Sequence, residues 1–256
     1  PLGYSSRSLT WSCGLTFVME GAMMRLPSKR WFGVAASLAL LAGLLMLAPG
    51  TAAGAEAIGW SDPPRPALAH RKDAIYFVGD SITVEMFHSG DLIRRTADAR
   101  LKLSGRLARV GLSAALAAPY VERRARDFPY LVIVAVGTVD CFTGVPATTF
   151  EINMTRIIRA LGPTRHVALV DAFCRNSRPD GLRRERQING VLFRLAARNR
   201  NVSIHDWSGY VLTHPGTIHP LDWTHTHTTL EGTRRRVAIY LGIADQFAAK
   251  VRSARA

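Results

Sequence analysis

The sequence predicts an α/β protein whose parallel sheet is covered by helices on both faces. Two observations support this prediction. Short apolar runs alternate with segments of helical periodicity along the chain, and the apolar runs are continuous, as in strands buried on both faces. Alternation of strands and helices is typical of parallel sheets, because each return to the same edge of the sheet needs a crossover, usually a helix.

Five apolar runs are predicted as strands. In chain order they are 74–78 ("AIYFV"), 106–110 ("RLARV"), 130–136 ("YLVIVAV"), 166–170 ("HVALV") and 202–206 ("VSIHD"). Helices are predicted at about 84–99, 114–126, 148–161 and 182–198. A last helix is predicted to begin in "THTTLEG", where Thr228 and Glu231 have capping-box spacing. Its apolar stripe consists of Val237, Leu241, Ala244 and Ala248.

The chain before residue 73 does not have the pattern of a folded domain. Residues 1–23 are interpreted as an upstream extension. Residues 24–55 combine a basic start, a long apolar run and the small-residue pattern "AGA", which is the layout of a secretory signal peptide. The apolar run is also close to the length of a bilayer span, so an uncleaved membrane anchor is the alternative. Residues 56–72 are predicted to be an extended Pro-rich linker before one domain at 73–256.

The charge does not indicate a nucleic-acid partner. The formal charge is +14, and nearly all the cations are arginines. These arginines are scattered over several predicted helices without interleaved aromatic residues, so they indicate only non-specific attraction to anions. We expect a monomer that is secreted or held at the cell envelope, with the N-terminal segment as its membrane contact if it is not cleaved.

Polar residues follow the predicted strands at the places where each strand ends. These segments are "GDSIT", "GLSAA", "GTVDC", "DAFCRN" and "HPLDWTHTHTTLEG". In open α/β sheets, sites form beyond the carboxyl ends of the strands. Ser81 in the first segment could simply cap the next helix, but a serine nucleophile paired with a downstream base and acid is the second interpretation.

Asp222 and His225 could supply that acid and base. They lie three residues apart, so they must share one loop with the carboxylate turned back onto the imidazole. This spacing differs from that of α/β-hydrolases, and "GDSIT" also lacks the second glycine of their nucleophile elbow.

These segments resemble the sequence blocks of the SGNH or GDSL hydrolases. "GDSIT" is similar to the first block, with Ser81 as nucleophile, and "VGLSAA" to the second, with the Gly111 amide as an oxyanion donor beside that of Ser81. "FPYLVIVAVGTVD" resembles the third block and "DWTH" the fifth, which holds Asp222 and His225. The resemblance spans about 75–250.

The resemblance implies a flavodoxin-like three-layer α/β/α sandwich with a five-stranded parallel sheet. It also implies ester hydrolysis or acyl transfer through an acyl-serine intermediate, without metal or other cofactor. The expected substrate is an O-acyl group on an envelope glycan or lipid.

Two positions depart from the family pattern. The third block ends Gly-x-Asn-Asp, and Val139 stands where the asparagine would donate to the oxyanion. This departure leaves a second hypothesis open, a weak or inactive SGNH-type protein that binds a glycan or lipid. In the fifth block the family's glycine follows the catalytic histidine by five residues, which fits His227 and Gly232. The spacing from Asp222 favours His225 instead, and we prefer it because the acid–base hydrogen bond constrains geometry more tightly.

The other candidate residues have simpler interpretations. His219, Asp222, His225 and His227 could be metal ligands, but their spacing is not a recognised zinc pattern, so no metal is expected. Asp80 and Asp140 are interpreted as turn-stabilising carboxylates. Cys141 and Cys174 both follow strands that this fold makes neighbours, which predicts a disulfide in an exported protein; two free buried thiols are the alternative.

Overall fold

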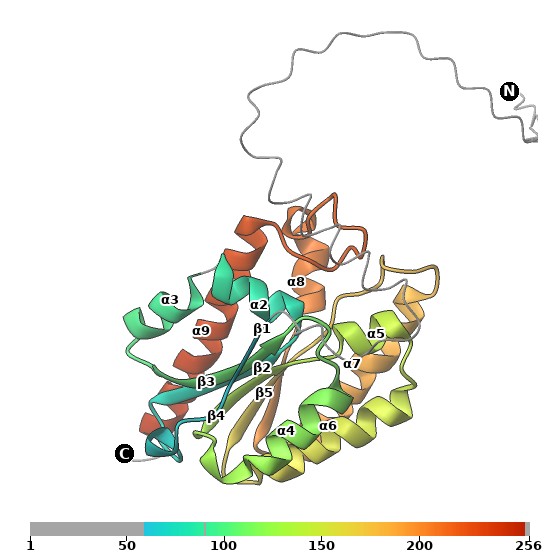
Figure 1. Ribbon diagram of the computed structural model, residues 1–256. Helices are drawn as coiled ribbons and strands as arrows, with labels where there is room; N and C mark the ends of the chain where they lie inside the picture. Colours follow the sequence, from blue (N-terminus) through green and yellow to red (C-terminus); the bar gives the residue numbers. More distant parts are fainter. Residues whose placement is uncertain (1–58, 90, 254–256) are drawn as a thin grey trace, which may run out of the picture. The chain divides into compact units, whose positions relative to one another are not determined.

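The central sheet contains the five predicted parallel strands and one further strand at its edge (Figure 1). The computed structural model describes residues 59–89 and 91–253. In this part the strand order is β1-β3-β2-β4-β5-β6, and β2 to β6 run parallel. The parallel strands are β2 (Ala74–Gly79), β3 (Lys102–Arg109), β4 (Leu131–Ala135), β5 (His166–Val170) and β6 (Val202–His205).

Helices cover both faces of the sheet, which gives the predicted three-layer α/β/α arrangement (Figure 1). One face is packed by α4 (Ala114–Arg123), α5 (Thr138–Thr143), α6 (Ala147–Leu161) and α7 (Gly181–Arg198). The other is packed by α2 (Ser81–His88), α3 (Leu92–Asp98), α8 (Trp207–Thr213) and α9 (Leu230–Ser253). Along β2, Tyr76 and Val78 enter the first core, and Ile75 and Phe77 enter the second. Both faces are therefore apolar, which explains the continuous apolar run in the sequence.

The sixth strand is an addition to the predicted five-stranded parallel sheet. β1 (Gly59–Asp62) pairs antiparallel with β3 and lies within the segment predicted as a linker. Trp60 holds it in place, since its ring contacts Phe87 edge-on at 5.8 Å and the Arg106 guanidinium lies 3.9 Å from its centre. Arg106 Nε also donates to Asp62 Oδ2 at 2.9 Å. The prolines begin only after Asp62, so the Pro-rich composition hid a strand of four residues.

Two helix boundaries also differ from the predictions. The helix predicted at 84–99 is split into α2 and α3, and Asp91 between them has a left-handed φ of 54°. The predicted cap of the last helix is displaced by one residue, because the Gly232 amide donates to Thr229 Oγ1 at 3.1 Å and α9 begins at Leu230. The Thr228 hydroxyl instead donates to Glu85, as described below.

The predicted extension, signal peptide and anchor lie outside the described residues. The residues that the structure does describe belong to one compact unit. None of the helices in this part is long and apolar enough to cross a bilayer.

A disulfide joins Cys141 in α5 to Cys174 after β5, as the sequence predicts. The two Cα atoms lie 6.5 Å apart, and β4 and β5, which precede these cysteines, are parallel neighbours. Both sulfur atoms are buried with their residues. The bond ties the helix after β4 to the loop after β5 at the carboxyl edge of the sheet.

Replacing both cysteines by alanine should lower the free energy of unfolding by roughly 3 to 4 kcal/mol, because the bond closes a loop of 33 residues. Urea denaturation of the oxidised protein and of the double variant measures this difference. Reduction of the wild type before denaturation should reproduce the loss. Equal stability of the three samples would contradict the prediction.

Candidate active site

The junction between β2 and α2 places Ser81 at the carboxyl edge of the sheet. Asp80 caps α2, with its carboxylate accepting from the Ile82 amide at 3.1 Å, and Ser81 is the first residue of the helix. A Cβ at Gly79 would lie 1.9 Å from Thr83 Oγ1, so the strand can pass directly into the helix only with glycine at this position. Because Asp80 performs the capping, the Ser81 hydroxyl is not used for it.

Ser81 lies at one end of a chain of three polar side chains. Its Oγ is 2.9 Å from Nε2 of His227. Nδ1 of the same ring is 3.2 Å from Oδ2 of Asp222. Ser81, His227 and Asp222 therefore have the order of a nucleophile, a base and an orienting acid.

The preference for His225 as the base is not supported by this geometry. His225 is exposed and has a left-handed φ of 51°, at the turn where its amide donates to the Asp222 carbonyl. The chain reverses at this residue, and His227 is the histidine that returns to Ser81. His227, the alternative base indicated by its distance of five residues from Gly232, is the histidine that contacts Ser81.

The Asp222 carboxylate is held by the loop that follows it. Oδ2 accepts from the amides of Thr226 and His227, each at 2.8 Å, and from the Thr224 hydroxyl at 2.6 Å. Oδ1 accepts from the Thr224 amide at 3.1 Å. Burial alone would raise the pKa of Asp222, but the hydrogen bonds from His227, Thr224 and Thr226 outweigh it and hold the pKa well below its ordinary value. Asp222 therefore stays ionised.

Two more carboxylates act on His227. Glu85, one helical turn after Ser81, accepts from the Thr228 amide at 3.3 Å and from its hydroxyl at 3.1 Å. Burial lowers the pKa of His227, but the hydrogen bond to Asp222 and the charges of Glu85, Asp222 and Asp80 outweigh it, so the pKa is raised. Glu85 was not predicted from the sequence, although its spacing of four from Ser81 puts both on one helix face.

A buried cation, Arg236, acts on two of these carboxylates. Arg236 of α9 is 2% exposed, and its guanidinium lies 4.5 Å from the centre of the Trp207 ring and donates to the Tyr240 hydroxyl at 3.2 Å. Burial raises the pKa of Asp80 and of Glu85, and the charge of Arg236 acts in the opposite direction on both. Arg236 was not predicted as part of the site, because an arginine on the apolar side of a helix has no local signal in the sequence.

The proposed oxyanion donors lie beyond the same edge of the sheet. Register pairs Gly79 with Ala108 of β3 and with Ala135 of β4, so the residues that follow these three strands meet there. Gly111, after β3, has a φ of 76°, and a Cβ at this position would meet no atom within 4 Å. Val139, on α5 after β4, is half-buried.

Asp140 connects two of these segments. Its Oδ2 accepts from the Ala114 amide at the start of α4 at 3.0 Å, and burial raises its pKa to about 6. It thus links the start of α4 to α5.

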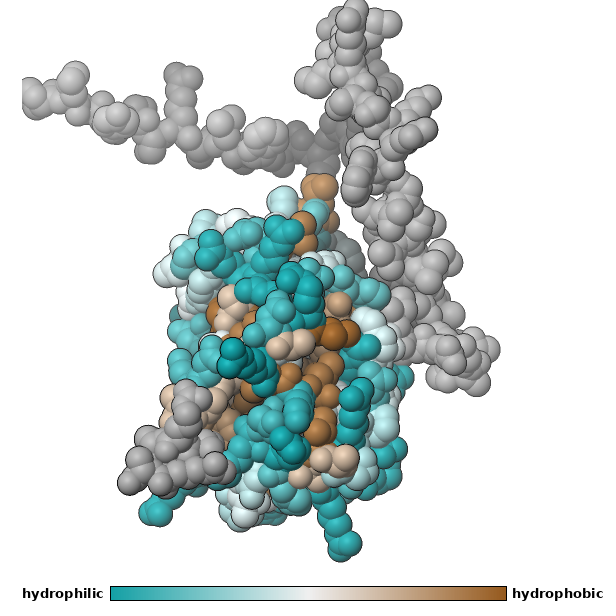
Figure 2. Space-filling model, turned by 90° about the vertical axis from the view of Figure 1, so that its left-hand side faces the viewer, coloured by the Kyte–Doolittle hydropathy of each residue, from teal (hydrophilic) through white to brown (hydrophobic). Residues whose placement is uncertain are grey.

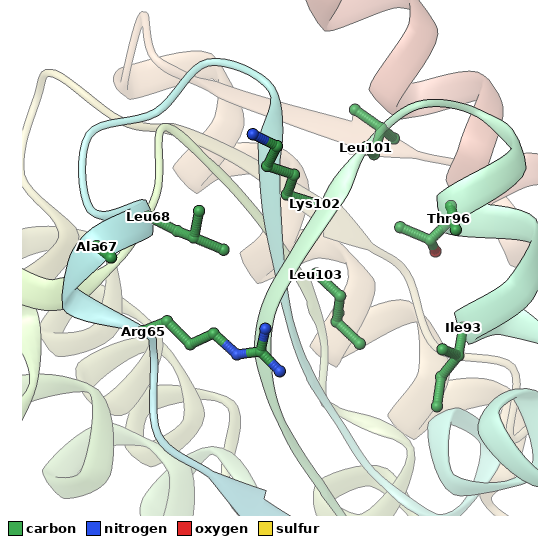
Figure 3. A pocket seen from close by; sticks show the side chains of 9 residues that line it. Arg65, Ala67, Leu68, Ile93, Thr96, Leu101, Lys102 and Leu103 are labelled. Carbon is green, nitrogen blue, oxygen red and sulfur yellow. The ribbon is translucent and has the colours of Figure 1, made fainter.

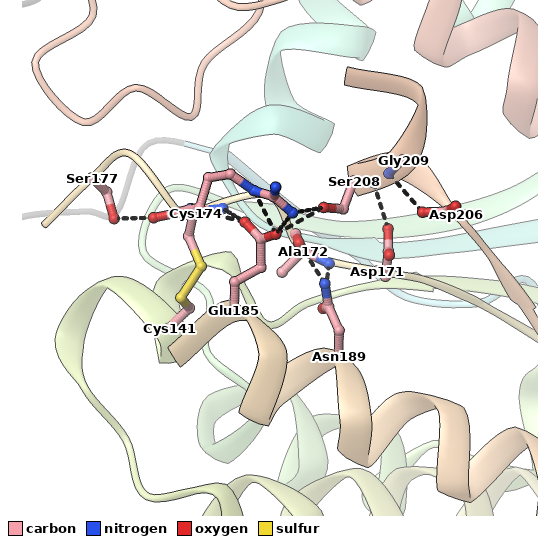
Figure 4. A network of polar contacts seen from close by, with 11 residues as sticks. Cys141, Asp171, Ala172, Cys174, Ser177, Glu185, Asn189, Asp206, Ser208 and Gly209 are labelled. Carbon is pink, nitrogen blue, oxygen red and sulfur yellow. Dashed lines mark hydrogen bonds and ion pairs between the residues drawn. A yellow bond between two sulfur atoms is a disulfide. The ribbon is translucent and has the colours of Figure 1, made fainter. Parts of the chain in front are cut away.

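The loop after β5 is fixed by a polar network beside the disulfide (Figure 4). Glu185, which is buried, accepts from the amides of Cys174 and Arg175, each at 2.8 Å, and from the Ser208 hydroxyl at 2.9 Å. Its carboxylate also forms an ion pair with the Arg175 guanidinium. Asp171 accepts from the Ser208 amide at 2.8 Å, and burial raises its pKa to about 7. This network ties the loop that carries Cys174 to α7 and to the start of α8.

The four residues considered as metal ligands do not converge. His227 and Asp222 pair with each other, His225 is exposed, and His219 Nδ1 accepts from the Leu221 amide at 3.2 Å. Among the residues that the structure describes, no group of three or more potential ligands lies together.

A second surface feature, a groove, lies at the amino ends of the strands, on the other side of the sheet from the strand ends that carry Ser81. A groove of about 490 Å³ is lined by Leu68, Ile93, Leu101 and Leu103, with Arg65 and Lys102 among its other residues (Figure 3). Figure 2 shows apolar side chains gathered on this face. Lys102 pairs with Ala74 at the start of β2, so the groove is at the amino ends of the strands, away from Ser81.

Comparison with known proteins identifies the fold. No family model and no curated protein matches the sequence. The C-terminal catalytic domain of peptidoglycan O-acetyltransferase A from Streptococcus pneumoniae is similar at 17% identity, with a TM-score of 0.53 over 73% of this chain and 96% of that one. A family 3 carbohydrate esterase from Clostridium thermocellum has 17% identity and a TM-score of 0.54, over 69% and 97%. A lipolytic protein of the G-D-S-L family from Veillonella parvula has 18% identity and a TM-score of 0.52, over 66% and 96%. The predicted SGNH/GDSL hydrolase fold is thereby confirmed.

His227 should titrate above its ordinary pKa of about 6.5, because Asp222 and its neighbours stabilise the imidazolium. The contribution of the His227 imidazolium to the free energy of unfolding should be fully present below pH 6.5 and be lost as the pH rises through the raised pKa. NMR titration of the ring protons measures this pKa. Asp222→Asn should lower it, and Asp98→Asn, which changes an exposed carboxylate elsewhere, should not. A pKa at or below the ordinary value in the wild type would contradict the assignment.

Proposed function

We propose that this chain is an exported serine esterase of the SGNH type, which hydrolyses or transfers an O-acyl group carried by an envelope glycan or lipid. The observation that supports the proposal most directly is the continuous contact from Ser81 through His227 to Asp222. Similar structures include a peptidoglycan O-acetyltransferase domain and a carbohydrate esterase, which favours an acyl group on a glycan.

The geometry fits acyl transfer in two half-reactions. Ser81 Oγ attacks the ester carbonyl while His227 Nε2 takes its proton, and ionised Asp222 stabilises the imidazolium that forms. The backbone amides of Ser81 and Gly111 donate to the oxyanion. His227 then protonates the leaving alcohol oxygen, which leaves an acyl ester on Ser81. A water or a second alcohol, deprotonated by His227, attacks this ester, the bond between the acyl carbon and Ser81 Oγ breaks, and His227 returns the proton to Oγ as the acid or the new ester leaves.

The alternative is a non-catalytic protein that binds a glycan or lipid through the same surface. Val139 favours it, because the valine side chain cannot donate to an oxyanion and the loss of one donor costs roughly a hundred- to a thousandfold in rate. The position of His227 against Ser81 favours the enzyme, since a binding surface does not require that alignment.

A fluorophosphonate probe together with hydrolysis of a short-chain aryl ester tests the proposal. The wild type should be labelled and active, and Ser81→Ala should lose both, while Ser89→Ala at the end of α2 should keep both. His227→Ala should reduce kcat by roughly a thousandfold or more, whereas His225→Ala should stay within a few-fold of the wild type. If the wild type is not labelled, the proposal of a serine esterase is wrong and the non-catalytic binding protein is favoured.

Val139→Asn should raise kcat by about one to two orders of magnitude, because it restores a side-chain donor at the oxyanion. Val139→Thr is the control, since its shorter hydroxyl keeps the shape of valine without the reach of an amide. Rates are compared on the same aryl ester. An unchanged kcat in the asparagine variant would mean that Val139 does not face the reacting carbonyl.

A further inference from the structure

A large aromatic side chain is exposed directly beside the acid of the site. Trp223 follows Asp222 in the chain and is 57% exposed, and Leu221 on the other side of Asp222 is 87% exposed. Exposed apolar side chains that are clustered near a site are typical of binding surfaces, because burial elsewhere would stabilise the fold. The proposed chemistry uses neither side chain.

Trp223 is paired with an aromatic residue from the other side of the site. The Phe142 ring lies 5.5 Å from it, centre to centre, at an interplanar angle of 76°. Phe142 belongs to α5, which also carries Val139. The pair therefore joins the acid-bearing loop to the helix that borders the proposed oxyanion hole.

Both members of the pair are held in position by their neighbours. Next to Trp223, buried Thr224 donates its amide and its hydroxyl to Asp222. Next to Phe142, Cys141 forms the disulfide, and Arg178 donates to the Phe142 carbonyl at 3.2 Å. A surface that is ordered before a ligand arrives loses little conformational entropy on binding.

The shape and chemistry of this surface favour a sugar ring over an acyl chain. An acyl chain is stabilised by removal from water on all sides, which an exposed surface does not provide. A pyranose ring has one face of C–H groups, which the electron-rich face of an aromatic ring attracts, and its hydroxyls can remain in water. Arg178 is exposed beside the pair, with its guanidinium 5.9 Å from the Phe142 centre, and can donate to hydroxyl or carboxylate oxygens.

We propose that Trp223 and Phe142 form a sugar-binding platform on which a pyranose ring of the glycan stacks, so that its acyl group reaches Ser81. The delivery of an acyl group rests on the proposed function, whereas the stacking of a sugar does not. The platform assigns the carrier of the acyl group to the glycans and makes Trp223 a specificity-determining residue.

Binding is measured first, in a Ser81→Ala background that cannot turn over. Chitopentaose and xylopentaose, with and without O-acetyl groups, are titrated while the Trp223 indole N–H signal and other protein resonances are followed by NMR. At least one of these sugars should bind, and Trp223→Ala should weaken its binding by roughly five- to tenfold. Trp223→Phe should restore part of the affinity, and Phe193→Ala, an exposed aromatic on α7, should change nothing. Affinities that are the same in the Trp223→Ala variant and its parent, or the binding of none of these sugars, would overturn the platform.

Kinetics then separate this proposal from the proposed function. With an intact Ser81, Trp223→Ala should raise KM for the acetylated oligosaccharide that binds by roughly five- to tenfold, and should change kcat/KM for p-nitrophenyl acetate, which carries no sugar, far less. An equal loss on both esters would indicate a purely structural role, and a loss that grows with acyl-chain length would indicate an acyl subsite; either result overturns the platform. If no ester is hydrolysed but the sugar binds through Trp223, the platform stands and the proposed function fails.

Discussion

The arrangement of the site depends on one carboxylate and the turn that encloses it. Asp222 accepts hydrogen bonds from two backbone amides and a hydroxyl on one oxygen, and from a third amide on the other. These bonds can form together only if the chain closes around the carboxylate within five residues. The closure presents the histidine at the end of the turn to Ser81 and leaves the one at its tip in solvent. It also leaves Trp223 pointing outward, since both of its neighbours are committed to the turn.

This arrangement brings several carboxylates close together in buried surroundings, which disfavour their charged forms. Asp80 and Glu85 lie near the site on α2 or at its start, and an isolated buried carboxylate would be protonated instead of charged. Arg236 and an imidazolium at His227 provide the opposite charge from the other side, on α9 and its preceding loop. The two segments are far apart in sequence, so the electrostatic balance is a property of the folded chain alone. It couples the protonation of His227 to the packing of α9 on α2.

The sequence predicts those features that depend on neighbouring residues, and it does not predict those that depend on contacts between distant segments. The parallel strands were predicted because burial on both faces leaves an apolar run that can be read directly, and Ser81 because a polar turn ends the first of them. β1 was missed because four residues before a Pro-Pro pair carry no periodic signal, and their partner β3 is distant. The three-residue spacing from Asp222 favours His225, but His225 itself has a left-handed φ, so the chain reverses there and brings His227 back to Ser81. A spacing in the sequence does not show such a reversal. Arg236 could not be predicted, since the Trp207 ring and the carboxylates of Asp80 and Glu85 near it come from segments distant in the sequence. The disulfide could be predicted, because the strand order that makes two strand ends neighbours follows from the fold class.

The edge strand limits where the chain can be cut. β1 covers the hydrogen-bonding edge of β3, and the Asp62–Arg106 pair places charge along it. An exported protein that lost its leader at the small-residue pattern before Glu56 would keep this strand whole. Trimming only a few residues further would uncover a row of unpaired amides and carbonyls on β3, the kind of edge to which a strand from another molecule can add. The four residues of β1 therefore protect the sheet edge, and a cut that removed them would favour association of the chain with other molecules.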